Sequence, residues 1–203
     1  MHPARPFHEA DESRLEALIA AAGLALIVGV ANGRPLCAHA PVLLADRRLR
    51  FHLSAANPLA KALVQGGEAL AVVIGPQAYV SPDWYGVEDQ APTWNYLSAE
   101  IEGPVRRLGA DEATRLLDDL TAAFEAPLAP KPPWTRAKMS PGQFDAMLAG
   151  VTAFEMHVRR LEGVRKLAQN KPLAAQRGVA DALDAAGDVV MAALIRASAA
   201  ASA

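Results

Sequence analysis

The dipeptide Asn32-Gly33 constrains the fold of this chain most, because it lies between two apolar runs. Asn-Gly adopts the positive φ angles of a tight two-residue turn, and between apolar runs it is the strongest short-range sign of a β-hairpin. It predicts that residues 24–30 and 35–44 pair as antiparallel strands. A second turn at Asp46-Arg47-Arg48 leads to residues 49–53, where apolar and polar side chains alternate as in a half-buried strand. Three successive strands without crossover helices favour an antiparallel sheet over a doubly wound parallel one.

The rest of the chain adds three strands and several helices to this meander. Strands are expected at 69–74, 96–106 (interrupted at Gly103-Pro104) and 151–161, and helices at 11–22, 57–64, 110–124 and 143–148. In the first helix, Ser13 and Glu16 match the S-x-x-E pattern of a capping box. Six short antiparallel strands commonly close into a barrel, which removes exposed strand edges. The expected fold class is therefore mainly β with peripheral helices, a six-stranded antiparallel β-barrel.

Composition limits the class of protein. The 203 residues are 52% hydrophobic and carry a formal net charge of −2, which is typical of a globular domain and argues against a chain-wide nucleic-acid surface. Residues 1–171 are expected to form the barrel domain, and the alanine-rich residues 172–203 a helical tail. The single Cys37 excludes an internal disulfide and a cysteine-built zinc site. No apolar run approaches the roughly 18 residues of a membrane span, and the first ten residues lack a secretory pattern, so a cytoplasmic protein is expected.

An anion site is one interpretation of residues 54–61. Here Ser54 follows a predicted strand, Asn57 is a natural N-cap before Pro58, and Lys61 adds a positive charge. A helix start offers free N–H groups and a favourable dipole to a phosphate. An ordinary, well-capped helix with a solvated lysine explains the same residues.

Three other groups of residues have both a functional and a structural interpretation. His39 and His52, on neighbouring predicted strands, are either hydrogen-bond partners of a ligand or half-exposed strand residues; they lack metal-ligand spacing, so no metal site is expected. The aromatic-rich residues 76–97 suit stacking on a planar ligand, a subunit interface or a core corner. The basic residues after the last predicted strand are either an anion contact or a solvated turn.

Motifs of dinucleotide-binding proteins, P-loop proteins, α/β-hydrolases, zincins and helix-turn-helix proteins are missing.

Taken together, these segments resemble the PaiB-type family of FMN-binding negative transcriptional regulators over about residues 1–180. The Pro-Thr-Trp-Asn-Tyr and Gln-Asn-Lys blocks are the most specific. One departure is Ala168, where the family is expected to have serine, and this removes one hydroxyl. The matching blocks are Ala38-His39-Ala40-Pro41, His52 with Asn57-Pro58, Gly75-Pro76 with Tyr79, Ser81-Pro82 with Trp84-Tyr85, Pro92-Thr93-Trp94-Asn95-Tyr96 and Lys166-Leu167-Ala168-Gln169-Asn170-Lys171.

The resemblance implies the FMN-binding type of split barrel, related to pyridoxamine-phosphate oxidases and flavin reductases. It implies a homodimer with FMN, as cofactor, at the subunit interface. The helix start at Asn57, with Ser54 and Lys61 nearby, would hold the phosphate, and His39 and His52 would lie beside the flavin or its ribityl chain. The ring would be faced by Trp94, Asn95 and Tyr96, and the site closed by Gln169, Asn170 and Lys171.

Two functions remain open at this point. One is an FMN-binding regulator of transcription, acting on DNA directly or through a protein partner, as the family name implies. The other is a flavin-dependent oxidoreductase acting on a small molecule, in which FMN would supply the redox chemistry. No residue stands out as a catalytic acid or base, although histidine is the side chain suited to that role near neutral pH, which makes His39 and His52 the candidates. Haem binding through a histidine is a third, weaker interpretation, drawn from relatives of the split barrel.

Overall fold

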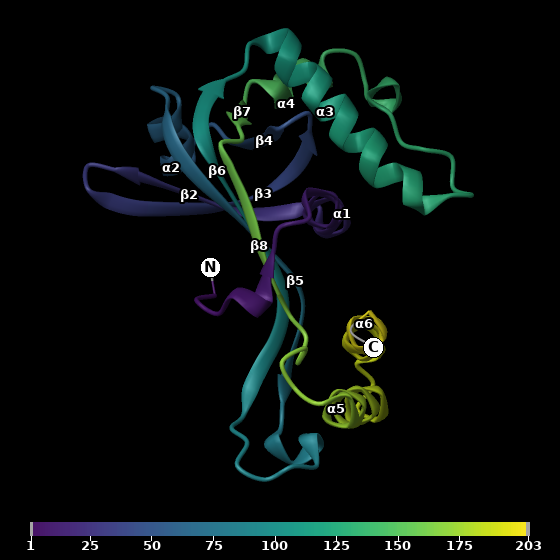
Figure 1. Cartoon of the computed structure of the whole chain (residues 1–203). Coiled ribbons are helices and arrows are strands. Elements are labelled where there is room, and N and C mark those ends of the chain that lie inside the picture. Colours follow the sequence, from purple (N-terminus) through teal and green to yellow (C-terminus); the bar gives the residue numbers. More distant parts are fainter. Residues whose placement is uncertain (1, 202–203) are drawn as a thin grey trace. The chain divides into compact units, whose positions relative to one another are not determined.

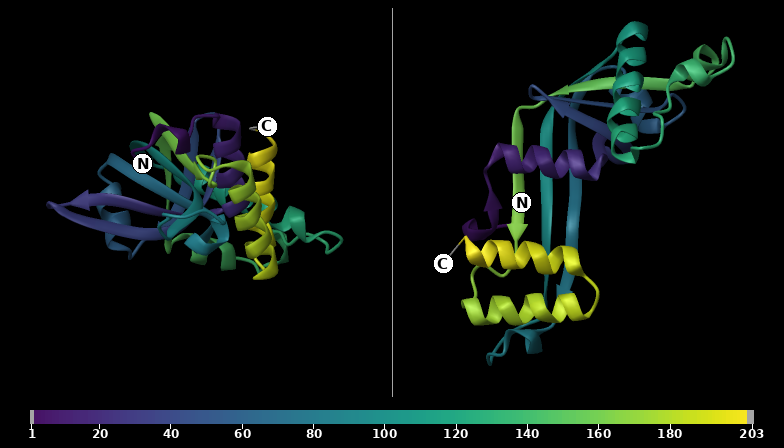
Figure 2. Two further views of the ribbon diagram at one scale, coloured as in Figure 1. Left: turned by 60° about the horizontal axis from the view of Figure 1, so that its bottom comes forward. Right: turned by 90° about the vertical axis from the view of Figure 1, so that its right-hand side faces the viewer.

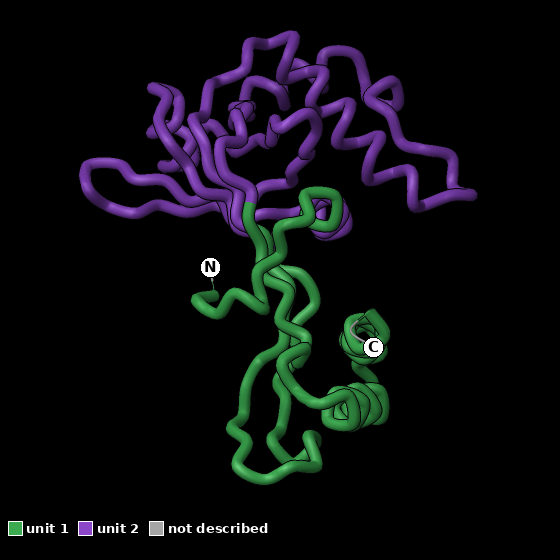
Figure 3. Tube along the Cα trace, viewed as in Figure 1, with its two compact units in different colours: residues 1–15, 74–99, 162–203 green, residues 16–73, 100–161 purple. Residues whose placement is uncertain are grey.

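The computed structural model describes residues 2–201, which form two compact units. Unit 1 comprises residues up to 15 together with 74–99 and 162 onward, and unit 2 comprises 16–73 and 100–161 (Figure 3). The helices are α1 Glu12–Ala22, α2 Pro58–Leu63, α3 Ala110–Glu125, α4 Gln143–Leu148, α5 Leu173–Ala185 and α6 Val189–Ala200. The strands are β1 His8–Glu9, β2 Leu24–Ala31, β3 Arg34–Ala45, β4 Arg48–Ser54, β5 Gly67–Val80, β6 Thr93–Arg107, β7 Val151–His157 and β8 Arg160–Lys166.

The strands form one sheet that closes on itself. Their order is β1-β8-β6-β5-β2-β3-β4-β7, and β7 also pairs with β6 (Figure 1). Six strands, β2 to β7, therefore make a ring of pairings, which confirms the expected mainly-β fold class. The described sheet has eight strands rather than six, because β8 and the two-residue β1 extend it beyond β6. Ring closure leaves each of the six strands with a neighbour on both sides.

Both predicted turns of the meander are present. Asn32 and Gly33 have φ angles of 52° and 73°, and Ala31 pairs with Arg34 across the turn. Asp46 and Arg47 also have positive φ, at 50° and 55°. These left-handed conformations match the twist of the flanking strands, so the turns fix the register of β2, β3 and β4.

The prediction of a single last strand over 151–161 is wrong. β7 ends at His157 and β8 begins at Arg160, and the chain changes pairing partner between them. The backbone N–H of Val158 donates to Arg47, and that of Arg159 donates to Glu102. Gly103 permits this close approach, since a Cβ there would lie 1.9 Å from the carbonyl oxygen of His157. β6, by contrast, runs uninterrupted through Gly103-Pro104.

The predicted capping box of the first helix is also wrong. The Asp11 carboxylate accepts from the backbone N–H groups of Ser13 and Arg14, at 3.0 and 3.4 Å, and from the Ser13 hydroxyl at 2.6 Å. Asp11 therefore caps α1, and Ser13 lies inside the first turn as a donor. Gly23, with φ +64°, ends the helix as expected.

Unit 2 is organised around the inner face of the ring. Leu49, Phe51 and Leu53 alternate inward along β4, and Phe51 stacks on Phe154 of β7 with ring centroids 5.4 Å apart. On the outer face, Arg50 pairs with Asp119 of α3 at 2.8 Å. α3 therefore covers the outward-facing side chains of β4.

Unit 1 has its own apolar core. α5 and α6 lie side by side and antiparallel (Figure 2), and they pack on the end of β5 and on Tyr85. Gly178 of α5 allows close packing, because a Cβ there would lie 2.5 Å from the Trp84 carbonyl oxygen. Both helices lie within the alanine-rich residues 172–203. The assignment of 172–203 as a separate tail stays a prediction.

Candidate functional site

The residues predicted to bind the cofactor fall into both units. Five belong to unit 2, and six belong to unit 1. Each set is described within its own unit. The first set is His39, His52, Ser54, Asn57 and Lys61; the second is Trp94, Asn95, Tyr96, Gln169, Asn170 and Lys171.

The junction between β4 and α2 is a capped helix start, as predicted. The Asn57 side-chain oxygen accepts from the Leu59 N–H at 2.8 Å, and Pro58 occupies the first helical position. The Ser54 hydroxyl oxygen accepts from the Ala56 N–H at 3.3 Å. α2 has only six residues, and Lys61 lies exposed in its last turn. The oxygen of Asn57 is thus already engaged, and the phosphate role of this segment stays a prediction.

His39 and His52 lie on the outward-facing side of adjacent strands in unit 2. Strand alternation sets this, because Ala40 and Val42 of β3 and Phe51 and Leu53 of β4 point into the core. His39 is exposed, whereas His52 is half-buried. The structure therefore gives the two histidines different surroundings on one face of the ring.

The His52 imidazole is the less solvated of the two. Its Nδ1 is buried and has no hydrogen-bond partner among the described residues. Burial lowers the pKa of His52, because the charged form loses solvation that nothing replaces. The ring is therefore neutral at pH 7.

His52 lines an apolar cavity of about 340 Å³ within unit 2. Its walls come from α3, α4 and the loop between them, which the sequence did not associate with the histidines. The amphipathic pattern of 110–124 and the lone Trp134 in a proline-rich loop were the available signs. The lining residues are Pro41, His52, Leu117, Asp118, Leu120, Thr121, Phe124, Trp134, Arg136, Met139, Phe144, Met147, Leu148 and Val151.

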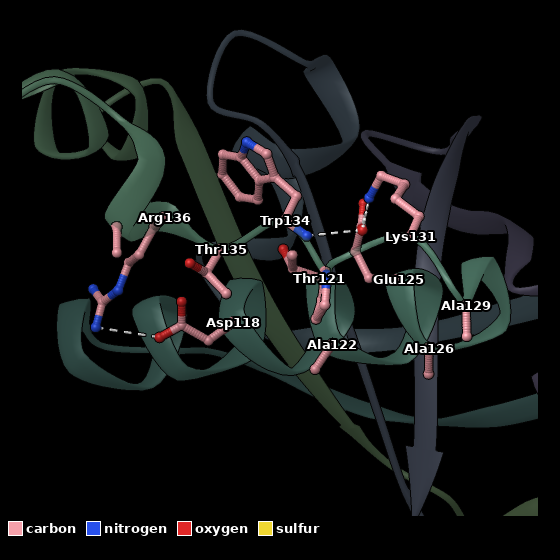
Figure 4. Close-up of a pocket in the computed structure, with 12 residues that line it drawn as sticks. Asp118, Thr121, Ala122, Glu125, Ala126, Ala129, Lys131, Trp134, Thr135 and Arg136 are labelled. Atoms are coloured by element: carbon pink, nitrogen blue, oxygen red, sulfur yellow. Dashed lines mark hydrogen bonds and ion pairs between the residues drawn. The ribbon is translucent and has the colours of Figure 1, made fainter.

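A second pocket, of about 600 Å³, shares part of this lining and lies between α3 and the loop that follows it. Figure 4 shows the polar contacts that hold the loop there. Arg136 pairs with Asp118 at 3.2 Å, and the backbone N–H of Trp134 donates to the Glu125 carboxylate at 2.8 Å. Lys131 pairs with the same carboxylate. These contacts position Trp134 at the boundary of the two pockets.

Unit 1 contains a buried amide without a partner. Asn95 on β6 is 1% exposed, and neither its side-chain oxygen nor its nitrogen has a hydrogen-bond partner among the described residues. Most buried polar side chains in folded proteins are satisfied, so such a group suggests a missing ligand atom, water or partner. The neighbouring residues of the strand differ: Trp94 is 53% exposed and Tyr96 is half-buried.

Two lysines lie close together in unit 1. The Lys171 ammonium donates to the Gln90 side-chain oxygen at 2.5 Å and lies 5.1 Å from the Tyr85 ring centroid. The Lys166 ammonium donates to the Thr93 hydroxyl at 2.6 Å. Burial, and then the charge of Lys171, lower the pKa of Lys166. Among the described residues neither lysine forms an ion pair with a carboxylate, so this positive charge is available to an anion.

Gln169 and Asn170 have different surroundings from Lys171. The Gln169 side chain accepts from the Leu167 N–H at 2.7 Å and donates to the carbonyl oxygens of Pro6 and Arg165. Its amide is therefore committed to holding the chain after β8. Asn170 is exposed, and Ala168 is buried with φ +60°.

The family of the chain follows from its match to a family model. Residues 1–160 match the model described as "Putative FMN-binding domain". The chain belongs to this FMN-binding domain family. The match includes β1 to β7 and the predicted site residues of unit 2, together with Trp94, Asn95 and Tyr96.

Relatives agree with this membership. The chain is 27% identical over 149 residues to the protease synthase and sporulation protein PAI 2 of Bacillus subtilis, covering 71% of this chain and 70% of that protein. The FAD- and haem-binding protein of Mycobacterium smegmatis is similar in structure, with a TM-score of 0.58, 21% identity and coverage of 78% and 73% of the two chains. The flavocytochrome Anf3 of Azotobacter vinelandii gives a TM-score of 0.63 at 15% identity, with coverage of 81% and 72%. At these identities the two structures support the fold alone.

Within residues 2–201, no helix is long and apolar enough to cross a membrane. The same residues contain no cluster of three or more His, Cys, Asp or Glu side chains that could hold a metal ion.

Proposed function

We propose that this FMN-binding family member works as a homodimeric, PaiB-like regulator of transcription, with FMN at the subunit interface. Two lysines of unit 1 carry the cofactor part of the proposal. Lys166 and Lys171 bring two positive charges together without an ion pair to any carboxylate of residues 2–201, and a phosphate group matches that charge.

The buried amide of Asn95 supports the same cofactor. A flavin ring edge carries both hydrogen-bond donors and acceptors, and the Asn95 side chain offers one of each in an enclosed position. In this proposal Lys171 holds the phosphate, Asn95 orients the ring edge and Trp94 covers its face. FMN supplies electron-transfer chemistry when bound, and the protein supplies binding and orientation.

The dimer part rests on exposed aromatic residues beside Asn95. Trp94 is 53% exposed and Tyr79 is 47% exposed, and their rings meet edge to face with centroids 6.2 Å apart. Exposed apolar side chains grouped in this way commonly mark interaction surfaces. Tryptophan and tyrosine are also enriched at protein interfaces.

A titration of dialysed protein with FMN, followed by flavin fluorescence, tests the cofactor site. We expect saturable quenching that weakens at least tenfold in Lys171→Ala, because a charge-assisted contact to phosphate is lost. Lys61→Ala tests the α2 segment in the same way. Lys138→Ala, in the exposed loop of unit 2, is the matched control and should bind like the wild type.

Two results would count against the proposal. Unchanged flavin fluorescence with the wild-type protein would remove the FMN role altogether. Wild-type affinity in both Lys61→Ala and Lys171→Ala would show that the phosphate binds elsewhere.

A separate pair of measurements distinguishes the regulator from the oxidoreductase. Salt-sensitive retardation of promoter DNA by the FMN-loaded protein would support the regulator. Accelerated anaerobic reoxidation of reduced FMN by a small-molecule extract, with no DNA shift, would favour an oxidoreductase instead.

A further inference from the structure

We propose that the apolar cavity beside His52 is a binding site for a small, neutral aromatic molecule that carries a hydroxyl group. The lining of the site comes wholly from unit 2, whereas the two lysines and Asn95 belong to unit 1.

The size and lining of the cavity indicate the ligand class. About 340 Å³ lies at the lower end of the roughly 300–1,000 Å³ range of small-molecule sites, which suits one or two fused rings. Phe124, Trp134 and Phe144 contribute aromatic rings, and Met139 and Met147 contribute adaptable thioethers. Planar apolar molecules pack well against such walls.

The charged groups of the lining neutralise one another. Asp118 pairs with Arg136 at 3.2 Å, and the Arg136 guanidinium also lies 5.1 Å from the Phe144 ring centroid. The Thr121 hydroxyl donates to the Leu117 carbonyl oxygen at 2.7 Å. A charged ligand would therefore find no opposite charge free to receive it, which favours a neutral one.

Two polar groups of the lining remain without a protein partner among the described residues: the His52 imidazole and the Trp134 indole N–H. Nδ1 of His52 is enclosed, so Nε2 is the nitrogen that remains for a ligand. Depending on the tautomer, Nε2 either donates or accepts a hydrogen bond. A hydroxyl does both, and it therefore satisfies a neutral His52 in either state.

Equilibrium dialysis with 2-naphthol and with naphthalene tests this inference. The two probes share a ring system and differ only in the hydroxyl group. We expect 2-naphthol to bind the wild-type protein about tenfold more tightly, the usual scale of one hydrogen bond. His52→Phe should bind both probes equally, because it keeps an aromatic ring and removes the polar partner.

Val151→Phe should fill the cavity and weaken both probes at least tenfold. Val190→Phe is the matched control, because Val190 is 54% exposed on α6 of unit 1. Thermal unfolding of every variant separates a filled cavity from a misfolded protein, and His52→Phe still tests the site if Val151→Phe fails to fold.

Three results would overturn the inference. They are unaltered binding in a folded Val151→Phe, an unchanged preference for 2-naphthol in His52→Phe, and displacement of 2-naphthol by FMN. The last would show that the cavity receives the flavin itself. The direct FMN titration reports separately on the cofactor, so failure of one proposal is distinguishable from failure of the other.

Discussion

The imidazole of His52 makes the free energy of unfolding depend on pH. Burial lowers the pKa of its imidazole in the folded protein, and Nδ1 has no partner to offset that effect. In the unfolded chain the ring titrates near its ordinary pKa of about 6.5. Between the lowered folded pKa and about 6.5, the unfolded state binds more protons. The free energy of unfolding contributed by His52 therefore falls as the pH drops through this window.

His52→Phe should remove this contribution. We expect the free energy of unfolding of the variant to change less between pH 7.5 and pH 5 than that of the wild type. Urea denaturation at several pH values measures it. His157→Phe, at an exposed position on β7, should keep the wild-type slope. An identical slope in His52→Phe and wild type would show that the acid sensitivity arises elsewhere.

The sequence predicted which residues belong to the candidate site, but not what surrounds them. The blocks around His52 and Asn95 were recognisable because their spacing along the chain is specific. Their surroundings were not predictable. The burial of Asn95 depends on what packs over β6, and the cavity at His52 depends on α3 and a loop more than sixty residues away in the sequence. Local patterns carry no information about such distant neighbours.

At the scale of elements, the ends of helices are decided by single side chains. Asp11 caps α1 through two backbone N–H groups, whereas Ser13 donates its hydroxyl to the same carboxylate. The capping-box pattern predicted Ser13 as the N-cap instead. Serine and aspartate are both good N-caps, and in the structure Asp11, which comes earlier in the chain, occupies that position.

Asp11→Ala should therefore destabilise the protein, because two backbone N–H groups at the start of α1 lose their acceptor. Ser13→Ala should cost less, since both backbone N–H groups keep their acceptor. Chemical denaturation of the two variants side by side measures the difference. A larger loss of stability in Ser13→Ala than in Asp11→Ala would contradict this assignment and support Ser13 as the N-cap.

Parts of the fold that depend on neighbouring residues were predictable, whereas parts that depend on distant residues were not. The turns at Asn32-Gly33 and Asp46-Arg47 are local structures, and their residues specify them directly. β8 was missed because Arg160–Lys166 shows no clean alternation, and no Gly or Pro marks the break before it. That break is set by hydrogen bonds to Arg47 and Glu102, which are distant in the sequence.

At the scale of the whole molecule, the exposed pair Tyr79 and Trp94 predicts a second subunit. Trp94→Asp would place a charge in that surface, and burying it in a dimer would be costly. We expect the variant to sediment as a monomer and to lose FMN binding as well, because the proposed flavin site includes the interface.

Val189→Asp is the control for this experiment. Val189 is 58% exposed at the start of α6, where a carboxylate is well tolerated. It should sediment like the wild type. A dimeric Trp94→Asp, or a wild-type protein that is monomeric at all concentrations, would contradict the predicted assembly.

The position of β7 in the ring sets an order of events during synthesis. β7 completes the ring by pairing with β4, about a hundred residues earlier, and with β6. Until the ribosome has released residues 151–157, β4 and β6 each present an open row of backbone donors and acceptors to other chains. Nascent chains stopped short of β7 are thus the form most prone to aggregate, and the last ring strand protects those made before it.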